Sequence, residues 1–245
     1  MASLDFLIGA LAVLVSTSLG AAAILAFKQV DRVTHSTMLA FSAGVMGFTT
    51  VEMFGQAHNA SGDLTVAAGF AAGLFFILAM DKLLPHIHLL VRKKHLELSY
   101  KKAALLAGSI SIHNIPEGLA IASAFAGSNS LGWLVTASMA LQDIPEGFLV
   151  SAPLAAYGVG MAKSLKLGIL SGVVEFAAAV AGYFFLSAFA GIVPFALAFS
   201  SGAMAYVIFV ELLPDAWKEG ERRTTLAAFA TGASLAFGLA SLLGF

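Results

Sequence analysis

The chain has 245 residues, of which 59% are apolar and 11% are charged, and its mean hydropathy is +0.91. This composition excludes an ordinary soluble domain and predicts a polytopic membrane protein. A net charge of −1 gives no electrostatic reason to expect a nucleic acid partner, and the absence of cysteine excludes disulfides, thiolate metal sites and cysteine nucleophiles.

Eight segments contain the roughly 20 apolar residues that a membrane-spanning helix needs. In chain order they cover residues 5–27, 34–56, 64–85, 102–126, 131–157, 165–190, 192–216 and 224–245. A membrane barrel would instead show alternating strands of about ten residues, so helices are expected throughout. The first segment lacks the basic stretch of a cleaved signal peptide, and we expect it to be retained. The loops are short, which predicts a single transmembrane domain over residues 1–245.

The lysines and arginines predict the orientation of these helices. All 13 lie in alternate loops or beside them, and the opposite loops carry none. By the positive-inside rule, the basic loops face the cytoplasm and both termini face outward. The expected location is the inner (plasma) membrane, with multiple passes of the chain through it.

A short motif occurs twice in the middle of the chain. HNIPEGLAIAS at 113–123 is followed 29 residues later by QDIPEGFLVSA at 142–152. The two segments run in opposite directions, so the repeat predicts a two-fold axis in the membrane plane. Such inverted repeats are typical of transporters with a substrate site at the repeat interface. A weaker echo links FSAGVMGFTTVEMF in the second segment with FSSGAMAYVIFVELL in the seventh, but their glutamates are one residue out of step.

The expected fold is therefore an all-α integral membrane protein. It has eight transmembrane helices and an inverted pseudo-two-fold repeat, in a 3+2+3 arrangement.

The repeated motif also predicts a polar centre at one depth in three segments. Within each copy, the first residue lies four positions before the glutamate and the second lies three before it, so all three share one helix face. Glu175 in the sixth segment lies at a similar depth. The expected centre comprises His113, Asn114, Glu117, Gln142, Asp143, Glu146 and Glu175.

These side chains indicate a metal centre. An unpaired carboxylate at the bilayer centre costs about 2.5–3.5 kcal/mol, and four carboxylates are expected there. A divalent cation draws several carboxylates together and keeps them ionised. Imidazole, carboxylate and amide ligands without sulfur suit Zn²⁺, Fe²⁺, Mn²⁺ or Co²⁺. The spacing fits one or two closely spaced cations, with Glu117 and Glu146 as bridging ligands.

Two prolines interrupt the same helices. Pro116 and Pro145 each remove one backbone hydrogen bond, and we expect them to kink the helices where the ligands lie. Gly118 and Gly147, two residues further on, permit close approach of another backbone.

On the HNIPEG and QDIPEG motifs the sequence resembles the ZIP (Zrt/Irt-like protein) family of divalent metal transporters, in particular its GufA-type prokaryotic branch. The resemblance covers the whole chain and implies uptake of divalent metal cations, Zn²⁺ first among them and Fe, Mn, Co and Cd as alternatives. It implies a binuclear mid-membrane centre, a homodimer, and an elevator-like motion of the first, fourth, fifth and sixth helices against the others.

The resemblance also implies two ligand sets. One metal site is similar to a set formed by His113, Glu117, Gln142 and Glu146. The other is similar to a set formed by Asn114, Glu117, Asp143, Glu146 and Glu175. The metal would be the substrate of transport, and no organic cofactor is expected.

Further polar residues lie near the helix ends. The family resemblance supports a cytoplasmic exit site of Asp81, His86, His88 and Glu211, and Asp215 lies near it. The alternative is ordinary polarity where side chains reach water. At the opposite face, Glu52, His58 and Asp63 suit either an entrance for the ion or interfacial positions. His95 is expected to anchor its basic loop against lipid headgroups.

Two other functions are alternatives to transport. A membrane zinc protease requires His-Glu-x-x-His, but Asn114 follows His113 and no second histidine lies four residues on, so an enzyme is not expected. A proton or cation channel could use the same chain of carboxylates.

Overall fold

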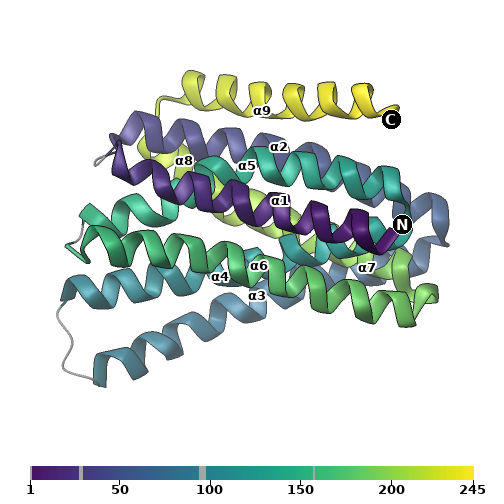
Figure 1. Ribbon diagram of the computed structural model, residues 1–245, viewed down its shortest axis with the longest axis horizontal. Helices are drawn as coiled ribbons and strands as arrows, with labels where there is room; N and C mark the ends of the chain where they lie inside the picture. The colour runs from purple at the N-terminus through teal and green to yellow at the C-terminus, as the bar shows by residue number, and fades with distance from the viewer. Residues whose placement is uncertain (1, 28–29, 94–97, 157) are drawn as a thin grey trace.

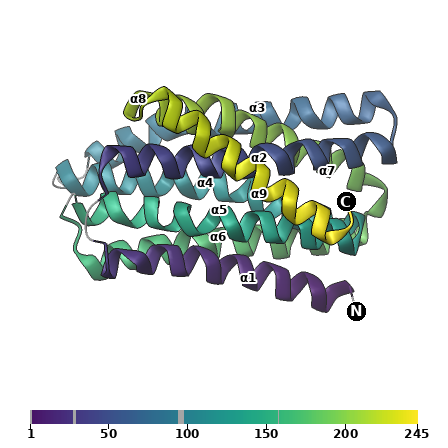
Figure 2. The same ribbon diagram turned by 90° about the horizontal axis from the view of Figure 1, so that it is seen from above.

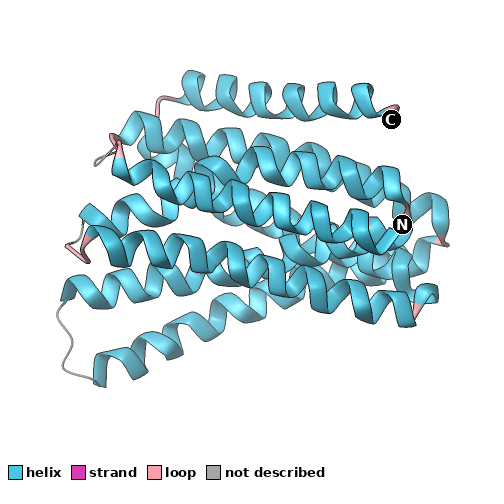
Figure 3. Ribbon diagram, in the orientation of Figure 1, coloured by secondary structure: helices cyan, strands magenta, loops and turns pink. Residues whose placement is uncertain are grey.

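The computed structural model describes residues 2–27, 30–93, 98–156 and 158–245, and the side chains of that part except for residues 2, 83–93, 98–112 and 219. The described chain is helical throughout and contains no strand (Figure 3). Its α-helices are α1 (Ala2–Ala22), α2 (Arg32–Ala60), α3 (Asp63–Lys93), α4 (Leu98–Gly127), α5 (Asn129–Ala156), α6 (Met161–Ala188), α7 (Val193–Tyr206), α8 (Leu213–Glu219) and α9 (Arg222–Leu243).

Helices α7 and α8 form one continuous rod, because a π-helical turn at Val207–Leu212 joins them. With this join, each of the eight predicted segments coincides with one helical rod. Six rods are long and apolar enough to cross a membrane. Helix α5 is less apolar than these because it carries three residues of the predicted centre, and much of α4 lies outside the described side chains.

The rods run roughly along the long axis of the molecule, and both chain termini lie at the same end (Figures 1 and 2). We call this the terminal end. Most of the described basic side chains lie at the opposite end, where α2, α6 and α9 begin and α8 finishes; these are Arg32, Lys163, Lys166, Lys218, Arg222 and Arg223. We call it the basic end. The alternation of charged and uncharged loops read from the sequence is thus reproduced by the fold.

Asp31 fixes the start of α2 at the basic end. Its carboxylate accepts hydrogen bonds from the backbone N–H of Thr34 (2.8 Å) and from the Thr34 hydroxyl (3.0 Å). These bonds favour the ionised form, the backbone one most, and hold the pKa of Asp31 below its usual value. The cap places His35 in the first turn of α2.

The inverted repeat is visible in how the helices pack. Helix α1 packs on α5 as α6 packs on α4, and α3 packs on α7 as α9 packs on α2. At the first of these contacts, a Cβ added to Gly147 would overlap the carbonyl oxygen of Thr17; at the second, one added to Gly118 would overlap that of Glu175. Gly118 and Gly147 are 29 positions apart, which is the spacing of the repeated motif. Their partners, Thr17 and Glu175, are 158 positions apart. The two contacts therefore correspond to each other under the inverted repeat. This confirms the close approach predicted at both glycines.

The other two contacts are equivalent in the same way. Gly44 of α2 faces the carbonyl of Phe229 in α9, and Gly202 of α7 faces the carbonyl of Phe70 in α3. In α2 and α7 the equivalent residues are 158 positions apart, whereas Phe70 and Phe229 are 159 apart. The weak echo between the second and seventh segments is therefore a true structural correspondence, with one extra residue inserted after it.

The extra residue lies in the π turn. A π-helical turn holds one residue more than an α-helical turn, and such turns are frequent at functional sites. Pro214 follows it and has no N–H to donate to the carbonyl of Val210, which weakens the regular α-helical pattern there. Within the turn, Glu211 corresponds to Glu52 rather than to Met53. Both glutamates lie eight residues before the end of their rods, at Glu219 and Ala60, so the one-residue mismatch in the sequence is accounted for.

Candidate metal centre

Three carboxylates from α4 and α5 converge in the middle of the bundle. Glu117, Asp143 and Glu146 each place one carboxylate oxygen within 4.8 Å of the other two. Glu117 and Asp143 are only 2% and 1% exposed. The buried Gln142 donates from Nε2 to Glu117 Oε1 at 3.1 Å, which joins the two copies of the motif directly.

The two remaining members from α4 and α6 flank this group. Asn114 is buried and donates from Nδ2 to the carbonyl of Ser171 at 3.2 Å. This bond leaves its amide oxygen to act as an acceptor. Glu175 is fully buried and close enough to Asp143 for their charges to interact. The predicted seven-residue centre is thus brought together, apart from the side chain of His113.

Several buried oxygen atoms of the centre have no hydrogen-bond donor among the described residues. They are Gln142 Oε1, Glu146 Oε1 and both carboxylate oxygens of Glu175. Leaving a buried acceptor unpaired costs about 1–3 kcal/mol. All of them are oxygen acceptors, so a bound cation could satisfy them together.

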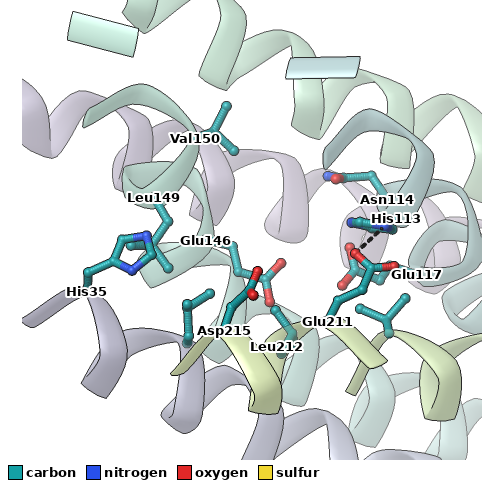
Figure 4. Close-up of a pocket in the computed structure, with 12 residues that line it drawn as sticks. His35, His113, Asn114, Glu117, Glu146, Leu149, Val150, Glu211, Leu212 and Asp215 are labelled. Carbon is teal, nitrogen blue, oxygen red and sulfur yellow. Dashed lines mark ion pairs between the residues drawn. The ribbon is translucent and has the colours of Figure 1, made fainter. Parts of the chain in front are cut away.

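The His113 side chain points to a second group. Its Nε2 lies 2.8 Å from Glu211 Oε2, an ion pair that Figure 4 marks with a dashed line. Asp81 of α3 joins them, with one ligand atom of each residue within 4.8 Å of the others. Tyr206 donates its hydroxyl to Asp81 Oδ2 at 2.8 Å and orients that carboxylate. Asp81 and Glu211 therefore lie together around His113, and their role as an exit site stays a prediction. The His86 and His88 side chains lie outside the described residues.

A cavity of about 180 Å³ connects both groups to the basic end. It is lined by His35, Leu39, His113, Asn114, Glu117, Glu146, Leu149, Val150, Val207, Glu211, Leu212 and Asp215 (Figure 4). Asp215 is 60% exposed, so the cavity reaches the surface there. Toward the terminal end, the buried side chains of Ile121, Leu134 and Met139 fill the space between the helices. The centre is open on one side of the bundle.

Comparison with known proteins decides the family. The family model described as "ZIP Zinc transporter" matches residues 91–241, more than half of the chain. The chain belongs to the ZIP family. It is 33% identical to the zinc transporter GufA of Myxococcus xanthus over 94% of this chain and 95% of that protein. It is also 33% identical to the zinc transporter ZupT of Chlorobaculum parvum, covering 91% and 92% of the two chains.

Membership of the ZIP family agrees with the eight-helix membrane fold and with the resemblance read from the two motifs. A further ZIP relative, the zinc transporter ZIPB of Bordetella bronchiseptica, is 29% identical over 97% of this chain and 81% of its own. All three relatives are named as transporters.

The predicted prolines lie inside helices that continue past them. Helix α4 runs through Pro116 and α5 runs through Pro145. Both prolines are buried, and the glycines that follow them make the close contacts with α6 and α1. A kink that opens the helices of this ZIP chain stays a prediction.

The outlying polar residues of this ZIP protein pair at its surface. Asp215 Oδ1 accepts from Lys218 at 2.8 Å, and both side chains are exposed. His58 Nδ1 lies 3.4 Å from Asp63 Oδ1 at the other face. Glu52 is part-buried and has no hydrogen bond or ion pair within the described part of the chain. His95 lies outside the described residues.

Two further residues of the ZIP site, one at each group of ligands, have no recognisable signal in the sequence. Thr17 of α1 is buried and donates its hydroxyl to Asp143 Oδ2 at 3.2 Å. It is the repeat counterpart of Glu175, but the first and sixth segments share no motif that could reveal this. Tyr206, which donates to Asp81, lies within the weak echo FSSGAMAYVIFVELL, but the echo does not mark it as a site residue.

Proposed function

We propose that the protein transports divalent metal cations across the membrane into the cytoplasm, with Zn²⁺ as the first substrate and Fe, Mn, Co and Cd as alternatives. The observation that carries the proposal is the convergence of Glu117, Asp143 and Glu146 around buried acceptor oxygens. Oxygen and imidazole ligands fit these metals, and the ZIP relatives are named zinc transporters.

Two metal positions share the centre in this proposal. Glu117 and Glu146 bridge them. The first position is completed by His113 and Gln142, and the second by Asn114, Asp143 and Glu175. Each bridging carboxylate supplies two oxygens, so two cations bring together carboxylates that would otherwise repel one another.

The His113 contact suggests how an ion leaves. In the state described, the imidazole is held by Glu211 rather than by Glu117. Asp81, His113 and Glu211 then form a relay beside the cavity that leads from the centre to the basic end, since His113 and Glu211 line this cavity together with Glu117 and Glu146. With the basic end at the cytoplasm and both termini outside, this relay is the exit.

Alternating access follows from the same asymmetry. The centre is open toward the basic end and packed toward the terminal end, so a second state must reverse this. The family supports an elevator-like movement of α1, α4, α5 and α6 against α2, α3, α7 to α8 and α9, within a homodimer. We expect a transporter and no enzymatic activity.

Uptake of radioactive zinc into proteoliposomes tests the function directly. The reconstituted protein should accumulate zinc above the level of protein-free vesicles, with saturation at increasing zinc concentration. An enzyme would show no such accumulation, and a channel would show currents without saturation in the same range. Wild-type protein that accumulates no zinc would refute the proposal.

Metal binding should weaken steeply in acid. Carboxylates and imidazole bind metal only when they have lost their protons, so binding releases protons and acid opposes it. We therefore expect the affinity for zinc to fall as the pH is lowered, since protons compete with the cation for the same ligand atoms. Isothermal titration of purified protein with zinc between pH 5 and 7.5 measures this. Affinity that does not change over this range would contradict the proposed ligands.

A further inference from the structure

The inverted repeat gives Glu211 a counterpart that the proposed centre does not use. Glu52 in α2 corresponds to Glu211 once the extra residue of the π turn is counted. We propose that Glu52 is the terminal-side partner of the centre: in the state open to the terminal end, it faces Gln142 and receives the incoming divalent cation with it. This proposal rests on the transport function proposed above.

The correspondence between Glu52 and Glu211 is inferred from the spacing of backbone contacts, and not from the fact that both residues are glutamate. Before the π turn, the backbone contacts that relate α2 to α7 are 158 positions apart; after it, those that relate α3 to α9 are 159 apart. Glu52 and Glu211 obey the second spacing. Gln142 and His113, which open the two copies of the motif, are likewise equivalent, 29 positions apart.

The two halves of the repeat differ in where the helix that carries the motif lies along its neighbour. In one half, His113 of α4 lies beside Glu211, with the side chains 2.8 Å apart. In the other half, α5 meets α2 at Ser42, whose hydroxyl donates to the carbonyl of Gln142 at 3.3 Å. The counterpart of Ser42 is Ser200, whose buried hydroxyl has no partner among the described residues.

In the opposite state, α4 would take the arrangement that α5 has here, and α5 would take that of α4. If α4 and α5 slide toward the terminal end, His113 leaves Glu211 for the level of Ser200, and Gln142 leaves Ser42 for the level of Glu52. Ten helical residues separate Ser42 from Glu52, roughly 15 Å along α2 at 1.5 Å per residue. The long side chains of Glu52 and Gln142 span part of that distance.

The chemistry of this pair suits a cation that arrives from outside. Glu52 is part-buried and free of hydrogen bonds and ion pairs in the described part of the chain, so its carboxylate can take a new ligand. Gln142 keeps its Oε1 without a donor. A carboxylate and an amide oxygen are both ligands for the proposed substrates, and Glu146 lies one turn from Gln142 to accept the ion next.

Zinc uptake by Glu52→Gln tests this role, with Asp5→Asn as the matched control. Asp5 is also acidic and lies at the terminal end, in α1, where its carboxylate accepts a hydrogen bond from Asn129 at 3.0 Å. We expect Glu52→Gln to raise the KM for external zinc about 10-fold, as for loss of a supporting metal contact. The number of metal ions bound at the centre at saturating zinc should not change. Asp5→Asn should stay within about twofold of wild type.

Because the chain contains no cysteine, proximity can be tested with introduced pairs. The double variant Glu52→Cys/Gln142→Cys should be linked by a short bismaleimide that replaces the length of the two lost side chains, since an irreversible linker traps even a rarely visited state. The pair His113→Cys/Glu211→Cys should be linked as the positive control, because the native side chains meet at 2.8 Å. Mass spectrometry of the linked peptides measures both reactions.

The outcomes separate this proposal from the function on which it rests. Wild-type protein that takes up no zinc overturns the transport function itself. Wild-type uptake with an unchanged KM in Glu52→Gln overturns only the role of Glu52, as does a KM raised equally by Asp5→Asn. Cross-linking of the control pair without any cross-linking of the Glu52/Gln142 pair overturns the proposed approach of the two residues.

Discussion

Replacing Glu117 with alanine should reduce zinc uptake by about 100-fold or more. Loss of a supporting contact around a metal already costs 10- to 100-fold, and Glu117 is proposed to bridge both positions directly. Its carboxylate converges with Asp143 and Glu146 and accepts a hydrogen bond from Gln142. Uptake in proteoliposomes and metal counting by anomalous scattering should both show the loss. Glu221→Ala is the matched control, because Glu221 is exposed and its side chain makes no cap bond for α9.

The same variant distinguishes a metal centre from a polar packing network. Glu117 is 2% exposed, and its charge is costly to bury when no metal is bound. Metal-free Glu117→Ala should therefore unfold at the same temperature as wild type or higher, while zinc should raise the unfolding temperature of wild type alone. A metal-free variant that unfolds well below wild type would show that Glu117 serves packing instead.

Substituting Gly118 with alanine should destabilise the protein by about 1–3 kcal/mol, the usual cost of forcing extra volume into a packed interface. The added Cβ would overlap the carbonyl of Glu175 and press α6 away from α4. Gly147→Ala should behave alike, because the carbonyl of Thr17 occupies the equivalent position. Thermal unfolding in detergent measures both.

Gly55→Ala provides the control for this effect. Gly55 lies inside α2, and a Cβ added there meets nothing within 4 Å. Alanine is the better helix former by about 1 kcal/mol, so Gly55→Ala should leave stability unchanged or raise it. Equal stability of the Gly55 and Gly118 variants would mean that the close contact between α4 and α6 is not needed.

The parts of the fold that sequence could predict are those with strong local signals. Each apolar segment is long enough to leave little choice of structure, and Lys and Arg mark alternate loops. The centre was predictable because HNIPEG and QDIPEG keep the same spacing in two antiparallel neighbours. Glu175 was predictable from its depth in the sixth segment and from the family resemblance.

The remaining features depend on contacts between distant segments. Thr17 reaches Asp143 across 126 positions, and neither the threonine nor its surroundings differ from ordinary membrane helix. The orientation of His113 toward Glu211 could not be predicted either. The i to i+4 spacing equally allows it to face Glu117, and the contact with Glu211 depends on the packing of α4 beside the rod of α7 and α8, which the sequence does not encode locally. The π turn is indicated in the sequence only indirectly, by the one-residue mismatch between Glu52 and Glu211 in the two echo segments.

The π turn also shows how a membrane helix can absorb an inserted residue. In a regular α-helix, one added residue would rotate every later side chain by about 100°. Here the disturbance is confined to six residues. Before it, Gly202 keeps its contact with Phe70, and after it the carbonyl of Ala216 still accepts from Ser36 at 2.7 Å. One extra residue in one half of an inverted repeat thus changes the position of an acidic side chain without disturbing the packing on either side of it.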